Sequence, residues 1–110
     1  MALYGDNACW AWVHWVHSTS IQSDYNISSI SHIGTGRYTV NIDNNASNSN
    51  YCVVANSEWD SSGSHRMALC GRTADGDHGT GSFGIRHHNP NSSASFNGST
   101  GLYAVVFATY

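Results

Sequence analysis

Residues 25–54, YNISSISHIGTGRYTVNIDNNASNSNYCVV, contain the pattern that decides the fold. Two β-rich runs flank the GTG segment at residues 34–36. Glycine enters the positive-φ conformations of tight hairpin turns at little cost, so this segment predicts a turn. After it, residues 37–42 (RYTVNI) alternate strictly between polar and apolar side chains. Such alternation is typical of a half-buried antiparallel strand, and it predicts an all-β protein.

Short runs of the same kind occur along the rest of the chain. The predicted strands span residues 10–17, 25–33, 37–42, 51–55, 65–72, 82–88 and 102–109, and polar loops are predicted at residues 18–23, 43–50, 57–64, 73–81 and 89–101. Within residues 25–33 the isoleucines are three apart rather than two, which indicates a strand with a bulge. About eight short strands separated by turns predict an antiparallel, jelly-roll-like β-sandwich over residues 10–110, preceded by an arm at residues 1–9.

Composition excludes several classes of function. The chain has 110 residues, enough for one domain, and only 10% of them are charged. Its net charge is −3 and it contains no lysine, so it offers little to attract a nucleic-acid backbone. No apolar run approaches the roughly 20 residues of a membrane-spanning helix, so we expect no membrane insertion. Low surface charge also favours association between copies.

The three cysteines, Cys9, Cys52 and Cys70, are an odd number and do not indicate a disulfide framework. We expect Cys52 and Cys70 to be small buried thiols within strands. A Cys52–Cys70 disulfide is the alternative.

Three predicted strands, at residues 10–16, 51–55 and 102–108, are apolar on both faces. A two-layer sandwich buries only one face of each sheet, and large exposed apolar patches are rare on monomers. We therefore expect identical copies to cover the second face. The predicted interface residues are Trp10, Trp12, Trp15, Tyr103, Val105 and Phe107.

Four segments carry a family resemblance: residues 11–15 (AWVHW), 25–30 (YNISSI), 34–41 (GTGRYTVN) and 50–54 (NYCVV). In order and spacing the chain resembles the C-terminal β-sandwich domain of bacteriophage tail-fibre and tail-tip proteins. The resemblance implies a homotrimer located in the virion and made in the cytoplasm of a bacterial host. Because Met1 precedes the match by only ten residues, we expect the domain to be a whole gene product. Its arm, with Leu3 and Tyr4, is then the segment that docks onto other virion proteins.

The function implied is structural and adhesive, not enzymatic. Rigid strands would hold the polar loops toward host surface glycans, and several copies would strengthen weak single contacts. A capsid decoration or head-fibre protein is the alternative within the same class. A free β-sandwich lectin is the alternative from another class.

Trp59 lies at the tip of a predicted polar loop, between Glu58 and Asp60. An aromatic ring flanked by hydrogen-bonding groups suits the face of a sugar, which makes these three residues a candidate glycan site. The alternative is that Trp59 folds back onto its own domain or a neighbouring copy.

Other chemistry-bearing residues point to no catalytic, cofactor or metal site. Of the seven histidines, His87 and His88 are adjacent and therefore point to opposite faces of a strand. A site formed by one histidine from each copy on a threefold axis is the alternative. Residues 75–79 (DGDHG) faintly resemble a calcium loop but lack its distal glutamate. No Gly-X-Ser-X-Gly nucleophile elbow occurs.

Overall fold

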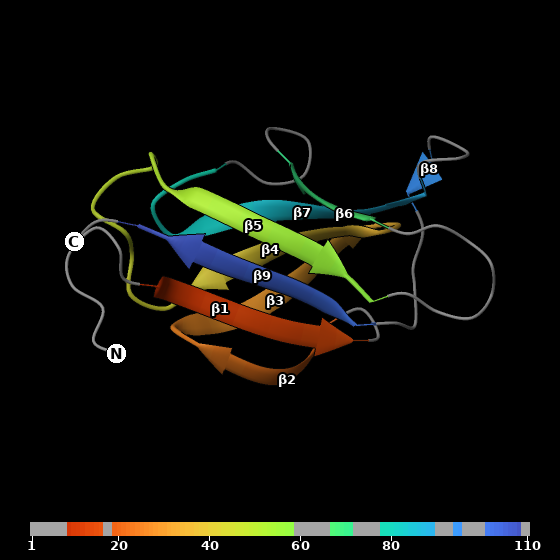
Figure 1. Ribbon diagram of the computed structural model, residues 1–110, viewed down its shortest axis with the longest axis horizontal. Helices are drawn as coiled ribbons and strands as arrows, with labels where there is room; N and C mark the ends of the chain where they lie inside the picture. Colours follow the sequence, from red (N-terminus) through yellow and green to blue (C-terminus); the bar gives the residue numbers. More distant parts are fainter. Residues whose placement is uncertain are drawn as a thin grey trace.

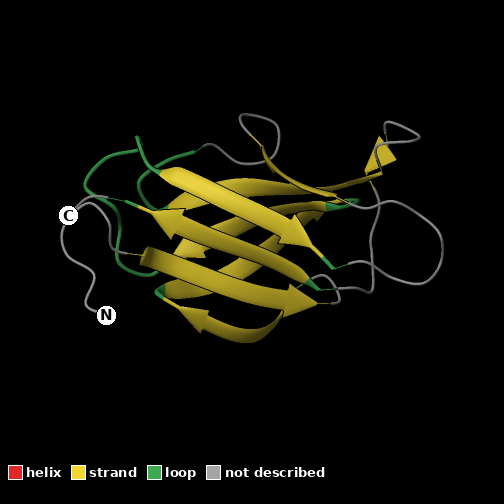
Figure 2. Ribbon diagram, in the orientation of Figure 1, coloured by secondary structure: helices red, strands yellow, loops and turns green. Residues whose placement is uncertain are grey.

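The computed structural model is an antiparallel β-sandwich without helices among the residues that it describes (Figure 2). It describes residues 9–16, 19–58, 67–71, 78–89, 94–95 and 101–108. Eight strands form two sheets of four, and a ninth strand of two residues extends one of them (Figure 1). The predicted fold class is therefore confirmed.

The first sheet has the strand order β2-β1-β9-β5 and faces the viewer in Figure 1. Its strands are β1 (Cys9–Val16), β2 (Ser20–Tyr25), β5 (Cys52–Ser57) and β9 (Leu102–Phe107). The last strand of the chain thus lies between the first strand and the fifth, so distant segments form the centre of this sheet.

The second sheet lies behind the first and has the order β3-β4-β7-β6. Its strands are β3 (Ile27–Gly34), β4 (Arg37–Ile42), β6 (Met67–Gly71) and β7 (Ser82–Asn89), and β8 (Ala94–Ser95) pairs with the end of β7. The chain moves from one sheet to the other after β2, β4, β5 and β8. The edge strands β5 and β6 lie against each other and close one side of the sandwich.

The β3–β4 hairpin agrees closely with its sequence prediction. Strand β4 has the predicted bounds, and its burial alternates residue by residue. Gly36 in the turn has a φ of 64°, the left-handed region that glycine adopts readily. The pairing register of β3 with β4 shifts between Ile27 and Ser29 and again between His32 and Gly34. These shifts agree with the predicted bulge, but the predicted start of the strand is wrong, because β3 begins at Ile27 and Tyr25 is the last residue of β2.

The prediction of a loop at residues 18–23 is wrong, because β2 begins at Ser20. Strand β2 is the edge of its sheet, and only Ile21 of its side chains is partly buried. An edge strand of this kind needs no alternation of apolar residues, so its sequence looks like a loop.

The core lies between the sheets and is formed by the inward side chains of both. Trp15 of β1 meets Tyr38 of β4 edge to face, with ring centroids 5.8 Å apart. Alternate residues of β4 and β7 point inward and are buried: Tyr38, Val40, Ile42, Phe83, Ile85 and His87. The largest buried side chains are Trp15, Tyr38, Phe83, Ile85, His87, Val13, Val40 and Val106.

The predicted burial of the strand cysteines is also wrong. Cys52 and Cys70 are both exposed, and Cys9 is half-buried. All three are free thiols, so no Cys52–Cys70 disulfide is present. Both strand cysteines lie on edge strands, β5 and β6, where the other sheet covers less of the chain.

Candidate functional site

The first sheet carries a continuous band of apolar side chains on the surface that points away from the core. Cross-strand pairing aligns Tyr25, Trp12, Val105 and Val54 in one row across β2, β1, β9 and β5. Side chains directly opposite one another in an antiparallel pair lie on the same face of the sheet. Tyr103 and Phe107 flank this row along β9. We call these residues the outer apolar face: Trp12, Tyr25, Val54, Tyr103, Val105 and Phe107.

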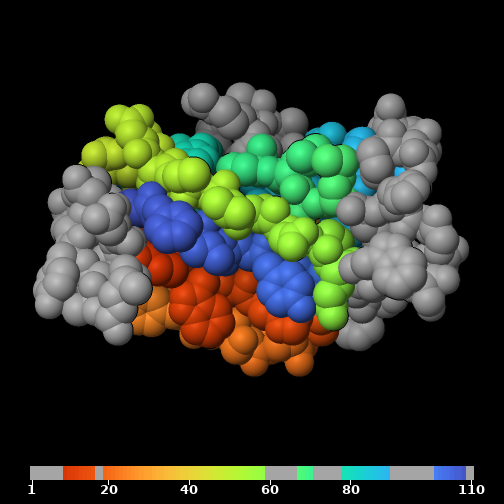
Figure 3. Space-filling view, in the orientation of Figure 1, coloured from red at the N-terminus to blue at the C-terminus, as the bar shows by residue number. Residues whose placement is uncertain are grey.

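Much of the outer apolar face is open to solvent. Tyr25 is 56% exposed, Val54 55%, Phe107 41% and Trp12 39%. Figure 3 views the molecule from this side and shows aromatic rings from β1 (red) and β9 (blue) next to each other on the surface. Large neighbouring apolar side chains exposed on one face mark an interaction surface.

Two of the six predicted interface residues do not belong to this face. Trp15 is 0% exposed and lies in the core, because its position on β1 points it inward with Ala11 and Val13. The prediction that Trp15 lies in an interface is therefore wrong. Trp10 is half-buried against the core at the end of the sandwich. Trp12, Tyr103, Val105 and Phe107 do point outward.

The outer surface of the second sheet is polar by contrast. Asn41 of β4 donates from its side-chain amide to the hydroxyls of Ser29 and Ser31 on β3, at 3.0 and 3.2 Å. Arg37 and Arg86 are direct cross-strand partners on β4 and β7. The described residues of the second sheet do expose three large apolar side chains, those of Ile33, Met67 and Leu69, but these lie on its edge strands β3 and β6, so they do not form a row across the sheet.

Glu58, the described member of the predicted sugar-binding loop, is engaged within the fold. Its carboxylate oxygen Oε2 accepts a hydrogen bond from the Gly101 amide at 2.7 Å. Its own amide donates to the Gly101 carbonyl at 2.8 Å. Trp59 and Asp60, and the docking residues Leu3 and Tyr4, lie outside the described residues.

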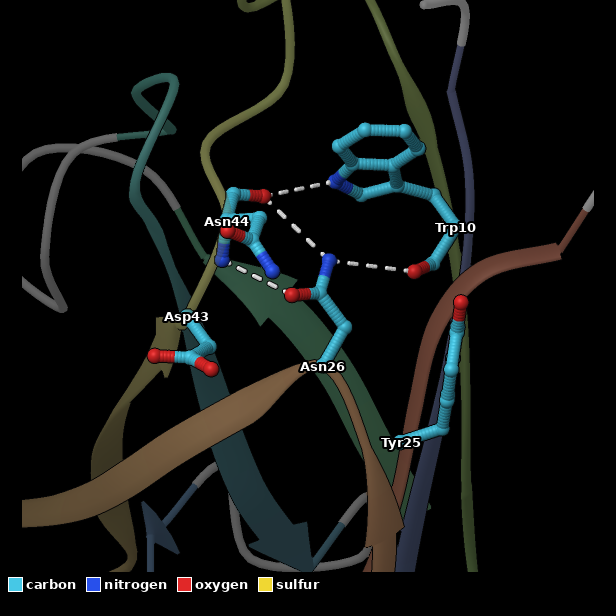
Figure 4. Close-up of a pocket in the computed structure, with 5 residues that line it drawn as sticks. All are labelled: Trp10, Tyr25, Asn26, Asp43 and Asn44. Carbon is cyan, nitrogen blue, oxygen red and sulfur yellow. Dashed lines mark hydrogen bonds between the residues drawn. The ribbon is translucent and has the colours of Figure 1, made fainter.

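A pocket of about 410 Å³ lies where β1, the β2–β3 junction and the end of β4 meet. It is lined by Trp10, Tyr25, Asn26, Asp43 and Asn44. In Figure 4 the two aromatic residues lie on one side, Asp43 lies on the other, and the two asparagines lie between them. Sequence reasoning missed this site, because its residues come from three separate segments of the chain.

Asn26 organises the pocket. Its side-chain amide donates to the carbonyls of Trp10 and Asn44, each at 3.2 Å, and its Oδ1 accepts from the Asn44 amide at 2.7 Å (Figure 4). The Trp10 indole N–H donates to the same Asn44 carbonyl at 3.1 Å. These bonds hold the indole and the turn at residues 43–44 in fixed positions.

The backbone of Asn26 has a φ of 57°, the one positive value at a non-glycine residue in the described chain. Asparagine tolerates this left-handed conformation better than most residues. The only sequence signal for the pocket was therefore an asparagine interrupting a β-rich run.

A second pocket, of about 250 Å³, is lined by Ser49, Asn50, Tyr51 and His78. The Cys70 Sγ lies 3.7 Å from Nδ1 of His78, the arrangement of a thiol beside a base. Although Cys70 as a whole is exposed, partial desolvation of its thiol, together with the nearby Cys52, raises the pKa of that thiol. A raised pKa depletes the reactive thiolate, so this pair lacks the activation of a catalytic cysteine.

Ser57 and His87 are the second pair in which a potential nucleophile lies beside a histidine. Ser57 Oγ and His87 Nε2 are 3.0 Å apart, and His87 is fully buried. A nucleophile needs access to substrate, and neither pocket described above includes this pair. The contact joins β5 to β7, and so links the two sheets.

Within the described ranges, no three His, Cys, Asp or Glu side chains gather closely enough to hold a metal ion. The same part of the chain has no helix of the length and hydrophobicity needed to cross a membrane.

Comparison with known proteins finds no matching family model, no matching curated relative and no matching solved structure. The case for a function therefore depends on the geometry described above and on the sequence resemblance.

Proposed function

We propose that this chain is a non-catalytic structural module of a bacteriophage virion, of the tail-fibre or tail-tip type, which assembles with identical copies and contributes to host attachment. The observation that carries the proposal is the outer apolar face on β1, β9 and β5. The resemblance in sequence supplies the virion context and the expected trimeric state.

The physical argument is the free-energy cost of leaving these apolar side chains exposed to water. Burying a side chain of the size of valine or phenylalanine contributes about 1.5–3 kcal/mol. Trp12, Val54 and Phe107 each gain part of this amount when another copy covers them. The exposed apolar side chains of the second sheet, Ile33, Met67 and Leu69, lie apart on its two edge strands. We therefore expect assembly to use the outer apolar face.

The oligomeric state tests the assembly part of the proposal. Sedimentation velocity of the full chain at micromolar concentration should show a trimer. Val54→Lys places a charge in the exposed row of the outer apolar face, on its edge strand β5, and should yield monomers with an unchanged circular dichroism spectrum. Ile33→Lys is the matched control, since Ile33 is an exposed β-branched residue (44%) on the other sheet. That variant should remain trimeric.

A stable monomer of the unmodified chain would contradict the assembly proposal, as would equal effects of the two lysine substitutions. The virion context has its own test, which is immunogold labelling of intact particles. Label on the tail supports the proposal, label on the head favours a capsid decoration protein, and absence from particles favours a free lectin.

A further inference from the structure

We propose that the pocket formed by Trp10, Tyr25, Asn26, Asp43 and Asn44 binds a neutral sugar unit of a glycan. This inference deepens the attachment part of the proposed function and rests on it for biological context. Tyr25 belongs to both the pocket and the outer apolar face, but the other four lining residues do not belong to that face, so sugar binding and assembly are tested by different variants.

The first step of the argument is the aromatic side of the pocket. Sugar rings present flat patches of C–H groups, and these pack against aromatic rings. The Trp10 indole is held by its N–H bond to Asn44 and by the bond from Asn26 to the Trp10 carbonyl. The ring is therefore positioned before a ligand arrives, which lowers the entropic cost of binding.

The second step is the polar groups that remain available. The Asp43 carboxylate, the Asn44 side-chain amide and the Tyr25 hydroxyl make no hydrogen bond with any residue in the described part of the chain. The backbone of residues 43 and 44 makes the structural bonds instead. A carboxylate accepts bonds from two neighbouring hydroxyls, and an amide both donates and accepts. Hydroxyl groups on adjacent ring carbons match this set.

The third step is size and charge. A volume of about 410 Å³ falls within the range of ligand sites in proteins. Among the residues that the structure describes, none of the five that line the pocket carries a positive charge, and Asp43 carries a negative one. An acidic sugar would be repelled, so the inferred ligand is a neutral hexose or N-acetylhexosamine.

An alkylammonium group is the other ligand that suits aromatic rings beside a carboxylate. Such sites surround the cation with rings, whereas here both rings lie on one side of the pocket (Figure 4). The Asn44 amide would also have no partner on a quaternary ammonium. A sugar can pack its C–H groups on the rings and bond its hydroxyls to the Asp43 carboxylate and the Asn44 amide at the same time. This match favours a sugar as the ligand.

The test is an NMR titration of the full-length protein with the methyl glycosides of glucose, galactose, mannose and N-acetylglucosamine, with choline as a further probe. At least one glycoside should bind saturably, with Kd in roughly the millimolar range expected for one weak site. Asp43→Ala and Asn44→Ala should each weaken binding by about tenfold or more. Both variants keep the backbone bonds of the turn, so they should fold normally.

Asp24→Ala is the matched control, because Asp24 is an exposed carboxylate next to Tyr25 that does not line the pocket. It should bind like the unmodified chain. Failure of all four glycosides to bind would overturn the inference, and so would binding that survives both pocket substitutions. Choline binding in their place would assign the pocket to a cation. Sedimentation of the same samples reports on assembly separately.

Discussion

The hydroxyl of Tyr51 joins the two sheets at one end of the sandwich. Tyr51 leads directly into β5, and its hydroxyl donates to the carbonyls of Gly79 at 2.6 Å and Ser82 at 3.0 Å, just before and at the start of β7. Its ring also stacks on His78, with centroids 4.1 Å apart. Burial, with the nearby Cys70 thiol, raises the pKa of Tyr51 from 10.0 to about 12.

This shift predicts a loss of stability at alkaline pH. The folded state holds the Tyr51 proton more tightly than the unfolded state does, so the contribution is complete below about pH 10 and disappears as pH rises from about 10 to about 12. Burial raises the pKa of Tyr38 as well, so the loss has more than one source. Urea unfolding across this range should show the decline, and absorbance at the tyrosinate band should report the titration.

Tyr51→Phe isolates the contribution of this hydroxyl. It should lower the free energy of unfolding at neutral pH by about 1–2 kcal/mol, because the partly buried carbonyls of Gly79 and Ser82 lose the one O–H donor that they share. It should also make the alkaline decline shallower than in the unmodified chain. An identical decline in both proteins would show that Tyr51 does not carry the effect.

At the scale of elements, the β5–β9 pairing ends in an unusually close contact. Gly101, just before β9, is bonded to Glu58, just after β5, through both backbone and side chain. His14 of β1 approaches from the other side, and its ring stacks on Tyr103 with centroids 4.4 Å apart. A Cβ at position 101 would overlap the Glu58 carboxylate and lie 2.7 Å from His14 Nε2. A residue with a Cβ at this position would require the Glu58 and His14 side chains to move.

Gly101→Ala should therefore destabilise the protein, by about 1–2 kcal/mol, since the added methyl group displaces the Glu58 carboxylate from its partly buried hydrogen bond to the Gly101 amide. Gly34→Ala is the control. A Cβ at position 34 would meet Arg37 Cδ at an ordinary 3.4 Å, so the change in unfolding free energy should stay within about 0.5 kcal/mol. Equal midpoints for the two variants in denaturant unfolding would contradict the argument.

At the scale of the whole molecule, the two outer surfaces differ in kind. The described residues of the outer apolar face include no Asp, Glu, Lys or Arg, whereas Arg37 and Arg86 lie on the opposite surface. Assembly through the apolar face should therefore depend on the hydrophobic effect and not on ion pairs.

This predicts how the proposed assembly responds to salt and temperature. Raising NaCl from about 0.05 M to about 1 M, which screens surface charges, should not weaken association. Cooling should weaken it, because hydrophobic stabilisation declines at low temperature. Sedimentation equilibrium measures both effects, and association that falls steeply with salt would instead indicate an interface built from charges.

Local pattern was enough to predict much of the fold. Strict alternation in residues 37–42 predicted β4 and its buried side, because the side-chain period of a strand is two. Apolar residues on both sides of β1 and β9 likewise predicted an outward apolar surface. Strand β2 was missed, since a polar edge strand obtains its structure from the hydrogen bonds of its neighbour β1. Its own side chains contribute little.

The order of residues along the chain was enough to predict the all-β class, the alternating burial of the central strands and the presence of apolar side chains with no place in the core. Tertiary structure alone decided that β9 lies between β1 and β5, which gathers those side chains onto one surface. It also brought Trp10, Asn26 and Asn44 together into a pocket. The reason is that the alternation of a strand is a pattern among neighbouring residues, which can be read from the sequence. Sheet order and pocket geometry depend instead on contacts between segments that are far apart in the chain.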